Sequence, residues 1–159
     1  MAALVLFDTN ILIDCSKGYA EAMTELAYWD GPAISAVTWM EWYGGADADE
    51  VPRFDAFMAE FALEIIDIDA VIMRAAATLV AKRRRAGKKI ALPDAIIQAT
   101  ADVHKLTIIT RNTKDFRGAN VRVPYTLETV TITRVVDVNP FGETPSGPGS
   151  GRPKLKRRR

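Results

Sequence analysis

The stretch Val5-Leu6-Phe7-Asp8-Thr9-Asn10 sets a short apolar run directly before an acid. The apolar run, taken from residue 3 to residue 7, predicts a buried strand, and residues 9–17 predict a helix. Residues 107–109 lead in the same way into Thr110-Arg111-Asn112. Two buried strands that each run into polar residues indicate a sheet with a polar edge.

The other apolar segments alternate between the strand pattern and the helix pattern. Strands are predicted over residues 33–36, 64–68, 121–123 and 129–136, and helices over 20–29, 37–43, from 49–52 onward, 69–85 and from 92 onward. The helix that Asp69 caps is expected to turn six residues inward: Val71, Ile72, Ala75, Ala76, Leu79 and Val80. Strands that alternate with helices predict a parallel sheet with helices on both faces.

Size and composition indicate one globular domain. The chain has 159 residues, 48% of them hydrophobic, and no apolar run approaches the roughly 20 residues that span a bilayer. The apolar start is too short for a signal peptide, so we expect a cytoplasmic protein. Cys15 is the only cysteine, which excludes an internal disulfide and a Cys-rich zinc site and suits a buried position.

Charge is distributed unevenly along the chain. The net charge is +1, and residues 152–159 contribute six basic residues and no acid, so residues 1–151 carry −5. Residues 145–151 are Pro, Ser and Gly only, which predicts a flexible linker. We expect one domain over residues 1–137, followed over residues 138–159 by a linker and a basic tail. The tail either attracts nucleic acid non-specifically or is an extension without a role.

Four acids stand at the start of a helical pattern or just past an apolar run: Asp8, Glu41, Asp94 and Asp115. Ligands of open parallel sheets bind beyond the carboxyl ends of the strands, and this rule brings the four acids to one crevice. Crowded acids repel one another unless a cation is bound. Mg²⁺ and Mn²⁺ prefer oxygen ligands and suit phosphodiester hydrolysis, so we expect a divalent-metal site.

Neutral polar residues are expected around these acids. Thr9 and Thr38 can offer hydroxyls, Thr110 can donate a hydrogen bond to a strand-end carboxylate, and Asn112 can orient an acid or the substrate. The chain lacks the residues that other hydrolytic mechanisms require. His104 is the only histidine, which excludes catalysis by a histidine pair, and the chain has no G-x-x-x-x-G-K phosphate loop.

Several charged residues also have simpler interpretations. Asp8 and Asp94 can each cap a helix, where a carboxylate meets free N–H groups. Asp14 and Asp102 are interpreted as surface acids. The six basic residues of 82–89 are either a solvated helix end or a rim that attracts RNA.

Four phrases in order resemble the PIN domain family and, within it, the VapC-type toxins of bacterial toxin–antitoxin pairs: residues 5–14, 34–41, 92–101 and 106–116. The resemblance runs from about residue 3 to residue 125. It implies an α/β/α sandwich around a central, mostly parallel sheet, and endoribonuclease activity that depends on Mg²⁺ or Mn²⁺. It also implies that the metal-binding acids are Asp8, Glu41, Asp94 and Asp115, with Thr9 and Asn112 beside them.

The same resemblance implies RNA as substrate, a cognate VapB-type antitoxin, and a homodimer that can join a larger toxin–antitoxin assembly. We expect metal-activated water to attack the phosphodiester. Asp8 and Asp94 would hold the first metal, Glu41 would orient water or bind metal, and Asp115 would help with a second metal. Two other functions stay open: a related metal nuclease that acts on DNA or in RNA processing, and a non-catalytic module whose acids bind a basic peptide.

Overall fold

The structure, a computed structural model, describes residues 5–128 and residue 130. Residues 5–127 belong to one compact unit. The strand predicted over residues 129–136 and the basic tail lie outside the described residues, except for Val130, which is in no regular element. No helix within the described part of the chain has the length and apolar content to cross a membrane.

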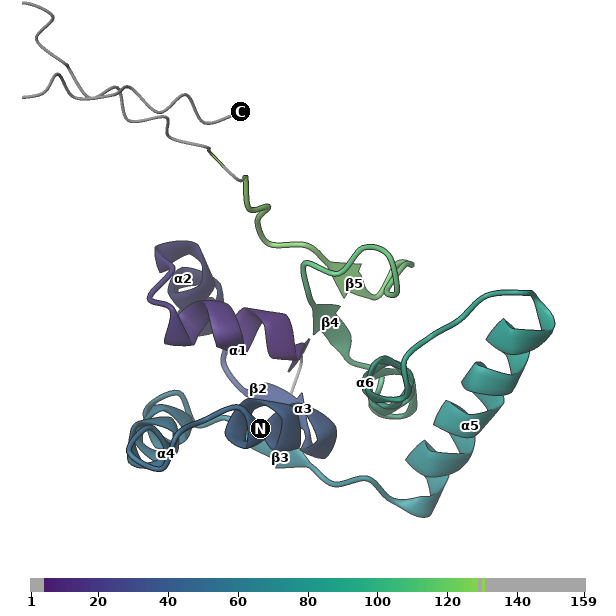
Figure 1. Cartoon of the computed structure of the whole chain (residues 1–159), viewed down its shortest axis with the longest axis horizontal. Coiled ribbons are helices and arrows are strands. Elements are labelled where there is room, and N and C mark those ends of the chain that lie inside the picture. The colour runs from purple at the N-terminus through teal and green to yellow at the C-terminus, as the bar shows by residue number, and fades with distance from the viewer. Residues whose placement is uncertain (1–4, 129, 131–159) are drawn as a thin grey trace, which may run out of the picture. The chain divides into compact units, whose positions relative to one another are not determined.

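Five strands form the sheet of this unit (Figure 1): β1 (Val5–Phe7), β2 (Pro32–Ser35), β3 (Glu64–Ile66), β4 (Thr107–Ile109) and β5 (Val121–Arg122). Their order is β3-β2-β1-β4-β5, and every neighbouring pair is parallel, which confirms the predicted sheet. The central strand β1 is fully buried, as expected for a strand that is covered on both faces. Phe7, its last residue, lies level with Ile34 of β2 and Ile109 of β4.

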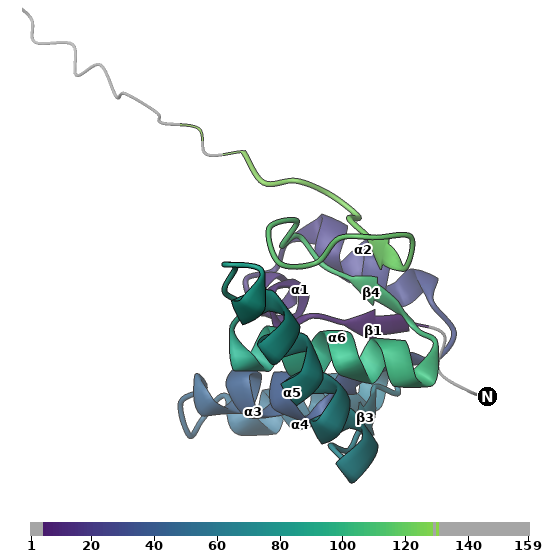
Figure 2. The ribbon, with the colours of Figure 1, turned by 90° about the vertical axis from the view of Figure 1, so that its right-hand side faces the viewer.

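Six helices cover the sheet: α1 (Thr9–Ser16), α2 (Ala20–Tyr28), α3 (Ala36–Gly44), α4 (Val51–Glu60), α5 (Ala70–Arg85) and α6 (Leu92–His104). Figure 1 shows α1, α2 and α4 on one side of the sheet and α5 and α6 on the other. Figure 2, seen from the second side, shows α5 in front of α6. The helices therefore make the outer layers of an α/β/α sandwich.

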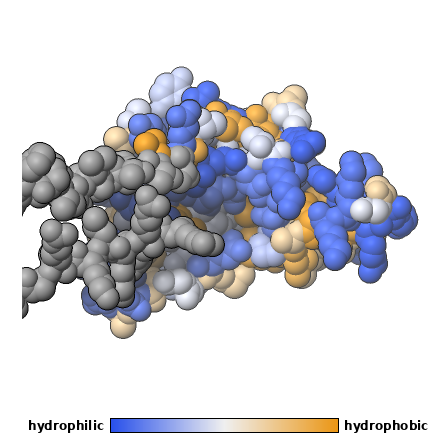
Figure 3. All heavy atoms as spheres, turned by 45° about the horizontal axis from the view of Figure 1, so that its top comes forward, coloured by the Kyte–Doolittle hydropathy of each residue, from blue (hydrophilic) through white to orange (hydrophobic). Residues whose placement is uncertain are grey.

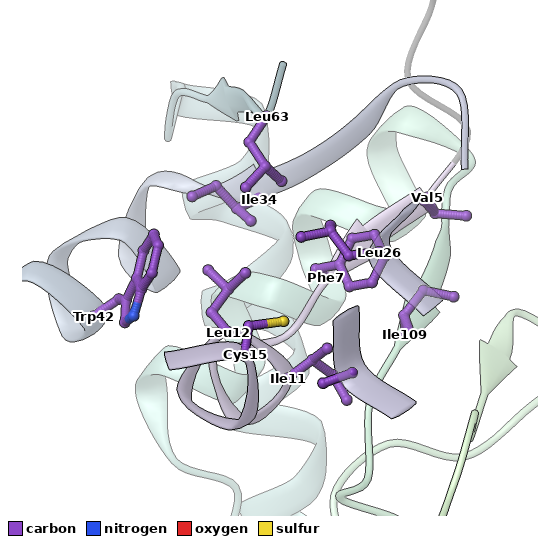
Figure 4. Packing of buried hydrophobic residues seen from close by; sticks show 11 residues of the cluster. Val5, Phe7, Ile11, Leu12, Cys15, Leu26, Ile34, Trp42, Leu63 and Ile109 are labelled. Carbon is purple, nitrogen blue, oxygen red and sulfur yellow. The ribbon is translucent and has the colours of Figure 1, made fainter. Parts of the chain in front are cut away.

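The first side of the sheet holds the larger apolar core. Ile11, Leu12 and Cys15 lie on one face of α1 and point toward Phe7 and its neighbours (Figure 4). Cys15 is 7% exposed, so its predicted burial is confirmed. On the second side, Ile97 and Ala101 of α6 pack on the sheet, and Ala95 and Ala99 of the same helix pack against α5.

The predicted inner face of α5 is wrong at one residue. Val71 is 59% exposed, whereas Ile72 and Ala76 are buried. Because α5 packs mainly on another helix, its buried stripe is narrower than the stripe of a helix that lies flat on a sheet. The remaining predicted inner residues, Ala75, Leu79 and Val80, are partly buried beside that stripe.

The strand order reverses at the middle of the sheet. From β1 the chain adds β2 and then β3 on one side, and it returns to the opposite side of β1 with β4 and then β5. Helix α1 follows β1, and a loop over residues 110–120 follows β4. In open parallel sheets, this reversal point is where a ligand crevice forms beyond the carboxyl ends of the strands.

Candidate active site

Asp8 lies at the reversal point, directly after β1. Its backbone N–H donates to the carbonyl oxygen of Ile109, 3.0 Å away. Its Oδ1 accepts from the backbone N–H of Thr9 at 2.7 Å, while Oδ2 accepts from the Thr110 hydroxyl at 2.6 Å and from the Asn10 amide at 2.5 Å. Asp8 is 4% exposed. It therefore caps α1, as one interpretation expected, and also holds a fixed position at the sheet edge.

Glu41 comes to the same edge from α3. The Thr9 hydroxyl donates to Glu41 Oε2 at 2.6 Å and lies 3.4 Å from the Thr38 hydroxyl oxygen. Thr9 thus contacts Asp8 through its backbone N–H and Glu41 through its side chain. The two predicted hydroxyl residues, Thr9 and Thr38, both lie beside this glutamate.

Asp115 is held by the loop that follows β4. The Asn112 amide donates to Asp115 Oδ2 at 3.0 Å, and the Asp115 backbone N–H donates back to Asn112 Oδ1 at 3.2 Å. The Asn112 backbone N–H donates to the Thr110 hydroxyl oxygen at 2.9 Å. Since Thr110 also donates to Asp8, a chain of hydrogen bonds connects the first and the fourth acid. Asn112 itself orients Asp115.

Asp94 lies in the first turn of α6, and the negative charges of the other three acids act on its carboxyl group. Burial, as the largest cause, and the charges of Asp8, Asp115 and Glu41, in that order, together raise its pKa from 3.8 to about 6. Burial also raises the pKa of Asp8, with a contribution from Glu41. The structure therefore brings all four predicted acids together. The alternative interpretation of Asp94 as a helix cap is wrong, because α6 begins at Leu92 and its cap position is Ala91.

The four acids have the right chemistry for a hard divalent cation. All four offer carboxylate oxygens as ligands. The negative charges of the other three acids disfavour the ionised form of Asp94, and a bound cation would offset this repulsion. As the side chains stand, no three carboxylates, histidines or cysteines in residues 5–128 are arranged to hold a metal ion. Glu41 and Asp115 are bound by neutral donors.

The raised pKa of Asp94 predicts how the stability of the metal-free protein depends on pH. The unfolded chain ionises Asp94 near pH 3.8 and the folded chain near pH 6, so the free energy of unfolding falls as pH rises between these values. We expect a loss of about 1 kcal/mol, since solvent screens a partly exposed group. Urea unfolding in EDTA at about pH 4 and about pH 7 measures it.

Two variants control for that measurement. Asp94→Asn should remove this part of the pH dependence, and Asp102→Asn should retain it, because Asp102 is exposed on the same helix. The prediction is contradicted if the parent and Asp94→Asn lose equal stability between the two pH values.

Asn10 and Arg111 were not predicted to have a role in this region, and the predicted surface position of Asp14 is wrong. Asn10 donates to Asp8 and accepts at Oδ1 from the Arg111 backbone N–H at 3.2 Å. Asp14, expected on the surface, is 1% exposed and pairs with Arg111. Arg83 donates to the carbonyl oxygen of Asp115 at 3.2 Å. Asn10 and Asp14 are one turn apart on α1, but their partners are about 100 residues away, and no local pattern identifies such pairs.

Comparisons with known proteins agree on one family. Residues 5–120 match the sequence pattern of the PIN domain. Over 116 residues the chain is 34% identical to Ribonuclease VapC10 of Mycobacterium tuberculosis (strain CDC 1551 / Oshkosh), a match that covers 71% of this chain and 86% of that protein.

Solved structures show the same likeness. A toxin–antitoxin complex from Klebsiella pneumoniae contains a chain that is 40% identical, with a TM-score of 0.65; the match covers 77% of this chain and 99% of that chain. A structure of VapBC2 from Rickettsia felis, bound to a DNA fragment from their promoter, contains a chain that is 26% identical, with a TM-score of 0.63 and coverage of 74% and 95%.

Proposed function

The chain belongs to the PIN domain family, and we propose that it is a VapC-type toxin: an endoribonuclease that pairs with a VapB-type antitoxin. The observation that carries this function is the convergence of four acids at the reversal point of the sheet, within the residues that match the family. PIN-domain VapC nucleases generally use divalent metal ions. For this protein we propose Mg²⁺ or Mn²⁺, held by Asp8, Glu41, Asp94 and Asp115.

The structure supports distinct tasks for the residues of this site. A bound divalent ion would offset the charge of the phosphodiester and lower the pKa of a water molecule. Asp8 would be the fixed ligand, because hydrogen bonds from Thr9, Asn10 and Thr110 hold its carboxylate. Thr9 would position Glu41, and Asn112 would position Asp115. Asp94, with its raised pKa, would gain most from the cation.

Other parts of the proposal rest on the family resemblance. We propose that a basic segment of the antitoxin enters the acidic crevice and blocks it, and that the toxin is a homodimer which can join a larger toxin–antitoxin assembly. We also propose that the protein acts in the cytoplasm. The family match ends at residue 120, which is compatible with a domain over residues 1–137 and a separate tail over 138–159.

Metal removal tests the proposed activity. The purified full chain should cleave RNA in the presence of Mn²⁺, and EDTA should slow cleavage by at least about 100-fold, because each acid acts through the ion. Excess Mn²⁺ should restore the rate, and unchanged tryptophan fluorescence in EDTA would show that the fold is retained. Equal cleavage with and without EDTA would contradict the mechanism. Cleavage of DNA but not of RNA with the same sequence would instead favour a DNA nuclease.

A further inference from the structure

A hollow of about 380 Å³ lies between α5, α6 and the loop after β4, and four cations line it: Lys82, Arg83, Lys88 and Arg117. Lys82 and Arg83 are in the last turn of α5, Lys88 follows that helix, and Arg117 follows β4. Two residues of α6, Gln98 and Asp102, complete the polar part of its wall. Four cations thus face one carboxylate. Figure 3 shows hydrophilic side chains gathered over the end of the molecule that α5 forms, at the right of the view.

Two hydrogen bonds and one helical spacing relate the hollow to the four acids. Arg83 Nη2 donates to the carbonyl oxygen of Asp115 at 3.2 Å. Arg117 Nε donates to the carbonyl oxygen of Thr113 at 3.0 Å, on the same loop. Gln98 lies one turn of α6 after Asp94. Arg83 and Arg117 therefore bind backbone carbonyl oxygens in the loop that carries Asp115, and the hollow lies beside that loop.

The preference of cations for the C-terminal end of a helix explains only two of the four cations that line the hollow. Cations in the last turn of α5 are favoured by the helix dipole, which accounts for Lys82 and Arg83. Lys88 and Arg117 lie outside α5, yet they line the same hollow. Residues 1–151 carry a net charge of −5, so a polyanion approaching the crevice is repelled unless a local cationic surface attracts it.

We propose that this hollow binds a backbone phosphate of the RNA strand, next to the phosphodiester that is cleaved; this rests on the ribonuclease function proposed above. The side chains that line the hollow include no aromatic residue on which a base could stack, and its cations suit phosphate oxygens. The contact is independent of sequence. It positions the strand and leaves the choice of cleavage site to other residues.

Neutralising two of the cations tests the proposal. Lys82→Gln/Lys88→Gln spares Arg83 and Arg117, which bind the loop of Asp115, and so avoids disturbing that loop. In an Asp94→Asn background, which is expected to bind RNA without cutting it, this pair of changes should weaken RNA binding about fivefold at about 0.1 M salt. The slope of log affinity against log salt should become shallower by about 0.7, the loss of one single-strand phosphate contact. Fluorescence anisotropy across a salt series measures both.

A matched pair of changes controls for net charge. Lys17→Gln/Arg53→Gln removes the same charge from exposed positions outside the hollow and should leave the salt slope unchanged. With Asp94 intact, the hollow variant should raise KM and keep kcat, because the reacting phosphodiester is held elsewhere. Equal slopes for both pairs would overturn the proposal, even if the parent cleaves RNA normally. Poly-glutamate serves as a probe for an acidic peptide. If Lys82→Gln/Lys88→Gln loses poly-glutamate binding but binds RNA as the parent does, the proposal is overturned and the hollow is assigned to an acidic peptide.

Discussion

Asp94→Asn should reduce RNA cleavage by more than about 100-fold, since even residues that only support metal ligands change activity by about 10- to 100-fold. Asn keeps the shape of the side chain but removes the charge that a divalent ion needs. The fold should be retained, because Asp94 makes no capping contact in α6 and its ionised form is disfavoured by three neighbouring acids. Initial rates of cleavage with Mn²⁺, and calorimetric titration of Mn²⁺, measure the effect.

The matched control for this change is Glu60→Gln, at the end of α4. Glu60 is exposed and lies outside both the candidate site and the hollow, so its replacement should change the cleavage rate by less than about threefold. In bacteria without the antitoxin, the parent should arrest growth and Asp94→Asn should be harmless. Full cleavage by Asp94→Asn would remove Asp94 from the site. Harmless expression of the active parent would argue against the toxin role while leaving the nuclease intact.

Arg111→Ala should lower the free energy of unfolding by about 3 to 5 kcal/mol, the cost of leaving a buried charge without its partner. The Asp14 side chain is 2% exposed and accepts from Arg111 Nε at 2.5 Å and Nη2 at 2.9 Å. The Tyr125 hydroxyl, 2.8 Å away, would be its remaining partner in this group. Asp14→Ala should cost less, because the Arg111 side chain is 26% exposed and can turn to water.

A double variant separates the ion pair from simple loss of packing. Asp14→Ala/Arg111→Ala should be less destabilised than the sum of the two single variants, because neither charge is then left alone. Arg53→Ala, at an exposed position on α4, should change stability by less than about 0.5 kcal/mol. Urea denaturation measures all four. If Arg111→Ala is as stable as Arg53→Ala, the pair contributes nothing to the fold.

The Asp14–Arg111 pair also bears on the active site. Arg111 stands between Thr110, which donates to Asp8, and Asn112, which donates to Asp115. Its backbone N–H donates to Asn10. The buried pair therefore fixes the loop that carries two contacts to the acids, and it ties this loop to α1. Arg111 therefore contributes both to the stability of the fold and to the geometry of the candidate site.

Local sequence patterns were enough to predict most elements and all four acids of the candidate site. An apolar run that ends in Asp8 identifies β1, because a strand buried on both faces must be continuously apolar. Leu92-Pro93 marks the start of α6, since Pro is tolerated in the first turn, where its missing N–H has no partner to lose. These inferences depend only on residues close together in the chain, and the rule for parallel sheets then places the strand ends together.

What the sequence could not decide depends on partners far along the chain. Asp14 looks like a surface acid until the order β2-β1-β4 brings Arg111 beside α1. The hollow is formed by the end of α5, by α6 and by Arg117, which are far apart in the sequence. The physical reason is that backbone periodicity and capping are set by neighbours within a few residues. The burial and pairing of a charge are set by whichever strands and helices the completed sheet brings against it.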